Sequence, residues 1–241
     1  MEPEFTQEYA TAERDHWWFV ARRQILAKAL NSLHLDPECD ILEVGCGSGG
    51  NLELLSRYGN VYAHECDAVA RELANSRKIV QVEYGMLPDN IPFKEQRFDL
   101  IALLDVLEHI DDDVAALGAL YGRLKPNGVL LVTVPAYNFL WSHHDVVNEH
   151  KRRYHRVQLE RLMHKVGYHV KYMTYFNTLL FPAILAIRFL ENVLRMEDAN
   201  DISMPSKYVN AILRTILASE RVLIPHMRLP FGLSILAIAR K

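Results

Sequence analysis

Leu42-Glu-Val-Gly-Cys-Gly-Ser-Gly-Gly50 is the stretch that decides the fold. The apolar residues of 40–44 predict a short strand, and the glycines after it let the backbone approach a ligand closely. The helix expected at 50–58 begins there and offers N–H groups without partners. Glu65 follows 20 residues after Gly45, at the end of a second strand, where a carboxylate can accept both hydroxyls of a ribose. Together they predict a site for a ribose-bearing ligand.

Outward from this stretch, strands and helices alternate along the chain. An amphipathic helix is predicted over 13–34, and further helices over 67–76 and after Asp111-Asp112-Asp113, whose carboxylates favour a helix start. The other expected strands are 60–65, 79–84, 98–104, 128–134 after the turn at 125–128, and a final strand within 232–240. Such alternation predicts a doubly wound α/β sheet that binds ligands beyond the carboxyl ends of its strands.

Residues 178–230 interrupt the alternation with apolar helical runs over 181–194 and 208–224, split by a polar stretch with Pro205. We therefore expect one domain over 1–241, with an N-terminal helical lid (1–36), a core sheet (37–177 and 231–241) and a helical insertion (178–230). The most apolar run, 178–187, is too short to span a bilayer, which needs about 20 residues.

Composition limits the binding partners and the cellular compartment that can be expected for the protein. The formal net charge is −3 and the Lys and Arg residues are scattered, which argues against a nucleic-acid partner. The three cysteines, Cys39, Cys46 and Cys66, form no CxxC pair and are expected to be reduced thiols of a cytoplasmic protein. The first residues are acidic and polar, unlike a signal peptide.

The glycine turn fits two cofactor classes. Gly45-x-Gly47-x-x-Gly50 matches the dinucleotide fingerprint, so a nicotinamide-dependent oxidoreductase is one candidate. The longer run Glu43-Val-Gly45-Cys-Gly47-Ser-Gly49 resembles the first motif of the class I S-adenosylmethionine-dependent methyltransferases. An acid two residues before the first glycine is usual in that family and unusual in dehydrogenases. A binding module with the same pocket but without turnover is a third candidate.

Other segments carry the same resemblance. Phe98-Asp-Leu-Ile101 with Asp105-Val-Leu-Glu-His-Ile110 is similar to the family's fourth strand and its following loop, and Leu124-Lys-Pro-Asn-Gly128 to the turn before its fifth strand. The terminal strand resembles its seventh. The resemblance implies a seven-stranded, mostly parallel Rossmann-like sheet whose last strand is antiparallel, with S-adenosylmethionine as cofactor and S-adenosylhomocysteine as product.

The resemblance also implies roles for matching positions. Gly45 and Gly47 would lie against the methionine part of the cofactor, and Glu43 would hold its amino group or, alternatively, cap a neighbouring loop. Glu65 would hold the ribose, and Met86 stands where an acid usually meets the adenine amino group. The other positions expected at the cofactor are Cys46, Cys66, Leu87, Leu104, Asp105, Val106 and His109. Cys46 and Cys66 are expected to pack rather than react, and His109 would touch ligand or orient its own loop.

The N-terminal helix carries a second cofactor prediction. Trp18 and Arg22 are four residues apart and share a helix face. Since an arginine suits a bidentate pair with a carboxylate, this face is expected to close over the methionyl end of the cofactor. In the alternative, the tryptophans pack in the core and the arginines face solvent.

The loop after the fifth strand holds the candidates for acceptor chemistry. His titrates near neutrality and can take the acceptor proton, so His150 and then His143 are catalytic candidates, with Asp105 beside the reactive sulfonium. The His150-Lys-Arg-Arg-Tyr154 run would also fit a structural role, pinning the loop to the next helix. No metal is expected, because the adjacent His143 and His144 would point apart on a strand.

The expected reaction is methyl transfer to an oxygen of a small-molecule, sugar, lipid-linked or peptide-carboxylate acceptor. The apolar insertion would pack on the domain, form a homodimer interface, or provide an apolar wall for a lipid-like acceptor or weak contact with a membrane surface. The acceptor itself has no signature in the sequence.

Overall fold

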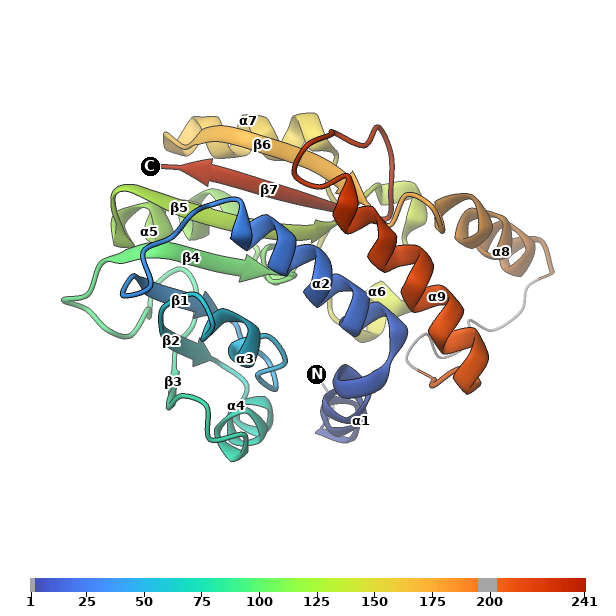
Figure 1. The fold of residues 1–241 in the computed structure, drawn as a ribbon, viewed down its shortest axis with the longest axis horizontal. Coiled ribbons are helices and arrows are strands. Elements are labelled where there is room, and N and C mark those ends of the chain that lie inside the picture. The colour runs from blue at the N-terminus through green and yellow to red at the C-terminus, as the bar shows by residue number, and fades with distance from the viewer. Residues whose placement is uncertain (1–2, 195–202) are drawn as a thin grey trace.

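The computed structural model describes residues 3–194 and 203–241. Within them lies a seven-stranded sheet of order β3-β2-β1-β4-β5-β7-β6 (Figure 1). Strands β1 to β5 pair in parallel, whereas β7 runs antiparallel to both β5 and β6, which confirms the predicted fold class. The strands are β1 Asp40–Val44, β2 Asn60–Glu65, β3 Val82–Tyr84, β4 Phe98–Leu104, β5 Leu124–Pro135, β6 His169–Phe176 and β7 Ser234–Arg240.

Helices cover both faces of this sheet. The α-helices are α1 Pro3–Asp15, α2 Trp17–Asn31, α3 Leu52–Leu55, α4 Ala68–Ser76, α5 Asp113–Arg123, α6 His143–Val147, α7 Arg156–Val166, α8 Phe181–Leu194 and α9 Lys207–Ser219. Helices α2 and α9 lie side by side on one face, and α5 and α7 lie on the other (Figure 1). A hydrophobic core lies on each face of the sheet, and the side chains of β4 alternate between the two. Ile101 and Leu103 pack toward α5 and α7, and Leu100 and Ala102 pack toward α2 and α9.

The prediction of one helix over 13–34 is wrong, because the chain breaks between α1 and α2. His16 has an extended backbone (φ −66°, ψ 135°). The side chain of Asn210 on α9 bridges the break: its Oδ1 accepts from the Trp17 N–H at 2.7 Å, and its Nδ2 donates to the Asp15 carbonyl at 2.9 Å. A residue nearly 200 positions away along the chain therefore stabilises the corner, and local periodicity could not reveal it.

Several other boundaries differ from those expected. The strand predicted over 79–84 begins only at Val82, whose backbone pairs with the Asn75 side chain at 2.8 and 3.2 Å. The helix over 50–58 shortens to Leu52–Leu55. The fifth strand starts early, at Leu124, and the expected turn at 125–128 loops out of the β4 pairing, with Asn127 at φ 63°.

The insertion contains the two expected helices, α8 and α9, and the polar residues 195–202 between them lie outside the described residues. Its two ends are tied together by Glu220, a buried carboxylate that follows α9. Glu220 accepts hydrogen bonds from the backbone of Asn177, Thr178 and Leu179 at 2.7 to 2.8 Å. Among the helices of the described residues, none has the length and apolar character that a bilayer crossing requires.

Candidate functional site

A cavity of about 640 Å³ lies where the carboxyl ends of β1, β2 and β4 meet helices α1 and α2. Its size falls within the range of small-molecule sites, roughly 300 to 1,000 Å³. The predicted site residues that line it are Trp18, Arg22, Gly45, Cys46, Gly47, Glu65, Cys66, Leu104, Asp105, Val106, His109 and His150. Residues from four distant parts of the chain therefore meet in one cavity.

The glycine turn after β1 forms one wall. Gly45 and Gly47 have φ values of 63° and 54°, in the left-handed region that glycine adopts without strain. A Cβ on Gly45 would lie 2.9 Å from a methyl group of Val106, so this position must stay small. A Cβ on Gly47 would meet nothing within 4 Å, so the backbone there faces open space that a ligand can fill.

Glu65 at the end of β2 is held in place by the same turn. One carboxylate oxygen accepts from the Gly47 N–H at 2.8 Å, and the other accepts from the Asp67 N–H at 2.9 Å. The oxygen bonded to Gly47 retains a second lone pair for one ribose hydroxyl. The other oxygen also accepts from the Cys66 thiol at 3.4 Å, a weak contact that a second ribose hydroxyl would replace. Beside it, burial and the Glu65 charge raise the pKa of the exposed Cys66 thiol to about 11, so this cysteine is a neutral thiol at pH 7.

Glu43 lies beneath the turn rather than on the cavity wall. Its side chain is 1% exposed, and Oε1 accepts from Asn51 Nδ2 at 3.0 Å. Oε2 has no hydrogen-bond partner among the described residues, and burial raises the pKa of this carboxyl to about 7. The sequence left two roles open for Glu43, and its contact with Asn51 fits the one in which it caps a neighbouring loop. The other role, a contact with the amino group of the cofactor, stays a prediction.

Arg22 projects from α2 into the cavity. Its Nη2 lies 2.5 Å from Asp105 Oδ2 and donates to Thr133 Oγ1 at 3.0 Å, and its guanidinium stacks 5.2 Å above the Trp18 ring. Its Nε has no partner among the described residues. Asp105 itself adopts φ 57°, a strained conformation for a residue other than glycine and one often seen at functional sites.

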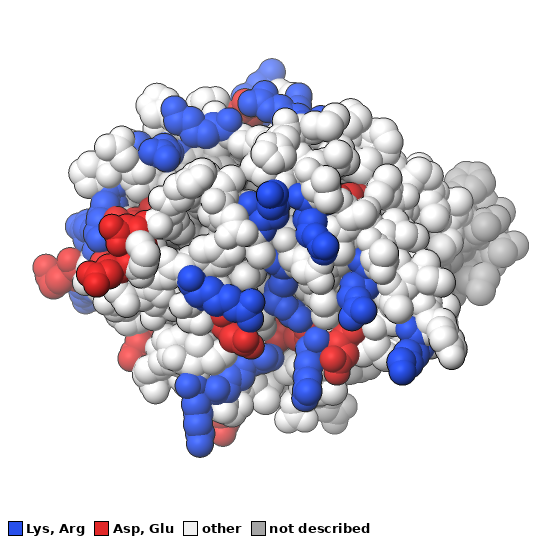
Figure 2. All heavy atoms as spheres, viewed as in Figure 1, with Lys and Arg blue, Asp and Glu red and all other residues white. Residues whose placement is uncertain are grey.

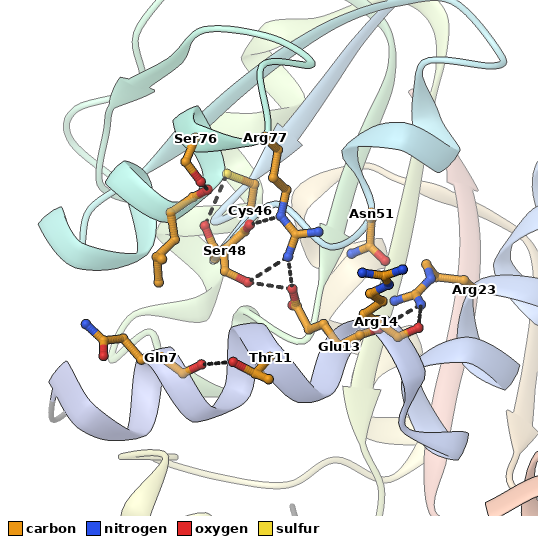
Figure 3. Close-up of polar contacts among 12 residues, drawn as sticks. Gln7, Thr11, Glu13, Arg14, Arg23, Cys46, Ser48, Asn51, Ser76 and Arg77 are labelled. Carbon is orange, nitrogen blue, oxygen red and sulfur yellow. Dashed lines mark hydrogen bonds and ion pairs between the residues drawn. The ribbon is translucent and has the colours of Figure 1, made fainter.

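Helix α1 is fastened to the glycine turn by residues that the sequence did not single out (Figure 3). Glu13 accepts from Ser48 Oγ at 2.5 Å and from Arg77 Nη2 at 2.8 Å. Arg23 Nη2 donates to the Glu13 carbonyl at 2.7 Å. Burial raises the pKa of Glu13, although Ser48 and Arg77 oppose that shift. The Glu13 side chain lines the cavity, so α1 closes one side of it.

Replacing Arg77 with alanine is expected to loosen α1. Glu13 is only 14% exposed and would lose its closest positive partner, a change that is costly for a largely buried carboxylate. Limited proteolysis within residues 3–15 should accelerate severalfold. Arg14→Ala is the matched control, because Arg14 is 87% exposed and the ion pair it makes within the described residues is with the exposed Asp15. Equal cleavage rates for both variants would mean that Arg77 does not hold α1.

At the other end of the cavity, an ion-pair network organises the loop after β5. Asp145, with a fully buried side chain, receives two hydrogen bonds from Arg153, at 2.7 and 2.8 Å, and one from His150 Nδ1 at 2.8 Å. Burial alone would raise the pKa of Asp145, but the bonds from His150 and Arg153 outweigh it and hold the pKa well below its usual range. His150 thus lies at the cavity in a fixed orientation, and Arg153 gives the His-Lys-Arg-Arg-Tyr run a structural role as well.

Besides Glu43, three predicted residues do not line the cavity. His143 is exposed at the start of α6, Met86 is about half exposed, and Leu87 packs in the core formed with α5 and α7. Met86 exchanges backbone hydrogen bonds with Asn90 at 2.8 Å. The roles proposed for these three side chains stay predictions. The side chain of His144 lies outside the described side chains.

The sequence missed Glu108 as a site residue, although it stands within the Asp105–Ile110 run. It is 1% exposed, lines the cavity, and follows β4 in a short 3₁₀ turn, Leu107–His109. Burial and the nearby Asp105 raise the pKa of Glu108 well above its usual value. Burial and the His150 charge lower the pKa of His109 to about 4. Two neighbouring residues with oppositely shifted pKa values mark this corner of the cavity as chemically distinctive.

Comparison with known proteins assigns the family. Residues 16–172, which contain the glycine turn, Glu65 and the β4 loop, match the model of a methyltransferase-domain family. The chain belongs to this family. The family predicted from the sequence is therefore confirmed, and with it S-adenosylmethionine as the cofactor, because the match is to methyltransferases and structures of this fold include SAM-dependent ones.

Relatives and solved structures agree with this family. The chain is similar to the ubiquinone biosynthesis O-methyltransferase of Xanthomonas campestris pv. campestris (strain B100), with 31% identity over 134 residues, 49% of this chain and 56% of that protein. The match thus spans about half the length of this curated relative. Two structures share the fold: a SAM-dependent methyltransferase from Archaeoglobus fulgidus (TM-score 0.56, 16% identity, 91% and 94% of the two chains) and Haemonchus contortus phosphoethanolamine N-methyltransferase 2 in complex with S-adenosyl-L-methionine (0.55, 18%, 90% and 52%).

Proposed function

We propose that the protein transfers the methyl group of S-adenosylmethionine to an oxygen atom of a small molecule. The observation that carries this proposal is the oriented Glu65, fixed by the Gly47 backbone at the edge of a cavity of about 640 Å³. Membership of the methyltransferase family identifies the cofactor, and the curated relative, an O-methyltransferase, supports oxygen as the acceptor atom.

The residues present suit this cofactor. The open space above Gly47 leaves room for the methionine part, and Glu65 would hold the ribose. The unpartnered Glu43 Oε2 and Arg22 Nε are polar atoms that a bound amino acid group, or water next to it, would satisfy. When bound, S-adenosylmethionine supplies a methyl group on a positively charged sulfur. The chain's part is to align the acceptor, keep water out and let the acceptor proton leave.

The acceptor end combines apolar and ionisable walls. Ile184 and Ile187 of α8 and Trp17 of α2 line the same cavity as His109 and His150. An aromatic or lipid-like alcohol or phenol fits this combination best. His143 and Asp105 stay weaker catalytic candidates than His150, because His143 lies outside the cavity and Asp105 is paired with Arg22.

The insertion supports a weak lipid or homodimer contact as part of this proposal. Large apolar side chains are exposed on it and beside it, namely Leu179, Leu185, Ile187, Met204, Tyr208, Val209 and Ile212. Lys and Arg side chains are spread over the viewed face rather than gathered in one patch (Figure 2), so no nucleic-acid partner is proposed. We place the protein in the cytoplasm.

Calorimetric titration tests the cofactor. We expect S-adenosylmethionine and S-adenosylhomocysteine to bind with one equivalent each, and the nicotinamide dinucleotides to give no heat of binding. A screen of phenols, catechols and hydroxylated lipids, with S-adenosylhomocysteine formation as the readout, would then find the acceptor. Binding of a dinucleotide in place of S-adenosylmethionine would refute the proposal.

A further inference from the structure

Three side chains with metal-binding atoms converge at the acceptor end of the cavity. Glu108 and His109 come from the 3₁₀ turn after β4, and His150 comes from the loop after α6. One potential ligand atom from each of the three lies within 4.8 Å of the others, and all three residues line the cavity. The rings of His109 and His150 meet edge to face, with centroids 4.7 Å apart.

Glu108 is the most unusual member of this cluster. Its side chain is 1% exposed, yet neither carboxylate oxygen has a hydrogen-bond partner among the described residues. A buried carboxyl group without partners is costly, because nothing replaces the water that it gives up. A buried carboxyl group of this kind, at the wall of a cavity, marks a place where a hydrogen-bond donor or a cation would bind. Asp105, the acid nearest to it along this turn, already has Arg22 as its counter-ion.

One of the two histidines, His150, is oriented as metal ligands usually are. His150 Nδ1 lies 2.8 Å from Asp145 Oδ1, and Asp145 is itself fixed by Arg153. The His109 ring lies near the backbone of Asn148 and packs edge to face against the His150 ring. Histidines that bind metals almost always donate one ring N–H to a carboxylate or a carbonyl, which leaves the lone pair of the other nitrogen for the ion.

We propose that Glu108, His109 and His150 bind one divalent transition-metal ion at the acceptor end of the cavity. Two imidazoles with one carboxylate suit Zn²⁺, Mn²⁺ or Fe²⁺ better than Mg²⁺ or Ca²⁺, which prefer oxygen ligands. Ligand atoms on one such ion are about 3 to 3.5 Å apart, so side-chain shifts of roughly 1 Å from the observed separations would complete the site.

Three protein ligands leave positions open for the acceptor. A hydroxyl placed there would have a lowered pKa and lose its proton to solvent, so His150 would serve as a ligand and not as the base. The acceptor oxygen then forms a bond to the methyl carbon as the carbon–sulfur bond breaks, and that electron pair stays on sulfur. This role rests on the proposed function, whereas binding of the ion does not. The sequence suggests a metal only at His143, His144 and Asp145, and none is expected there because adjacent histidines point apart on a strand.

Metal titration of the tag-free protein, stripped with a chelator and free of cofactor and acceptor, tests the proposal. We expect one equivalent of Zn²⁺ by calorimetry and of Mn²⁺ by electron paramagnetic resonance. Glu108→Gln and His150→Gln should each lower the affinity by about tenfold or more, since even changes outside the ligand shell cost that much. The matched controls are Glu95→Gln and His169→Gln, which alter exposed residues away from the cavity and should bind as the parent does.

Glu108→Gln keeps the test decisive even if other variants fold poorly. It replaces an unpaired buried carboxyl group with an amide of the same shape, so its thermal unfolding should be close to that of the parent. Failure of the parent to bind either ion below millimolar concentration, or equal binding by Glu108→Gln, would overturn the proposal. Titration of S-adenosylmethionine in the presence of chelator separates this result from failure of the proposed function.

Discussion

Replacing Glu65 with alanine is expected to lower the affinity for S-adenosylmethionine about a hundredfold. A hydrogen bond to a charged group contributes about 1.5 to 3 kcal/mol, so losing the acceptor of two ribose hydroxyls costs about 3 kcal/mol or more. The change also removes the partner of the Gly47 N–H, which fixes the glycine turn. Calorimetry with S-adenosylmethionine and S-adenosylhomocysteine measures the effect.

The matched control is Glu72→Ala, an exposed carboxylate on the neighbouring α4. It should bind the cofactor as the parent does. Thermal unfolding of Glu65→Ala shows whether the turn has collapsed as well as lost a contact. Affinity within about threefold of the parent would mean that the ribose is held elsewhere, and the orientation of the cofactor in the cavity would have to be reversed.

The cofactor half of the site was predictable because its parts lie close together along the chain. Gly45, Gly47 and Glu65 belong to one strand–helix–strand unit, and the connection between parallel neighbours fixes both strand ends at the same edge of the sheet. The spacing between the glycines and the acid therefore carries three-dimensional information. Asp105 follows from the same rule, since β4 is the other parallel neighbour of β1.

The parts that escaped prediction depend on contacts between distant segments. Glu13 meets Ser48 and Arg77 only after α1 folds back over the turn, and Glu108 meets His150 only after the loop following β5 closes. Neither acid stands at a spacing that a helix or strand pattern would single out. His143 shows the converse case: it stands close to His150 along the chain, whereas its side chain is exposed at the start of α6, and its catalytic role stays a prediction.

Replacing Asp145 with alanine is expected to produce the largest loss of stability. The substitution leaves the Arg153 guanidinium, only 5% exposed, without its counter-charge, and breaking a buried pair in this way costs about 3 to 5 kcal/mol. For a chain of this size the melting temperature should fall by about 10 °C. Asp111→Ala is the control: its side chain is 86% exposed and lies 3.7 Å from Lys151, so thermal unfolding should not change measurably.

The pH dependence of the stability difference between the parent and Asp145→Ala tests whether the charge of Asp145 causes the loss. The pKa of Asp145 is depressed in the folded protein, whereas an unfolded aspartate titrates near 3.9, so the folded state binds fewer protons over this range. The contribution of Asp145 is fully present above about pH 5, begins to fall near pH 4, and is lost progressively as the pH approaches the depressed pKa of the folded protein. Urea unfolding should therefore show a constant difference between parent and Asp145→Ala from pH 5 to 7 that shrinks at pH 3.5. A difference that persists undiminished at pH 3.5 would assign the loss to packing, because the unfolded aspartate gains a proton at this pH whereas the folded Asp145 stays ionised.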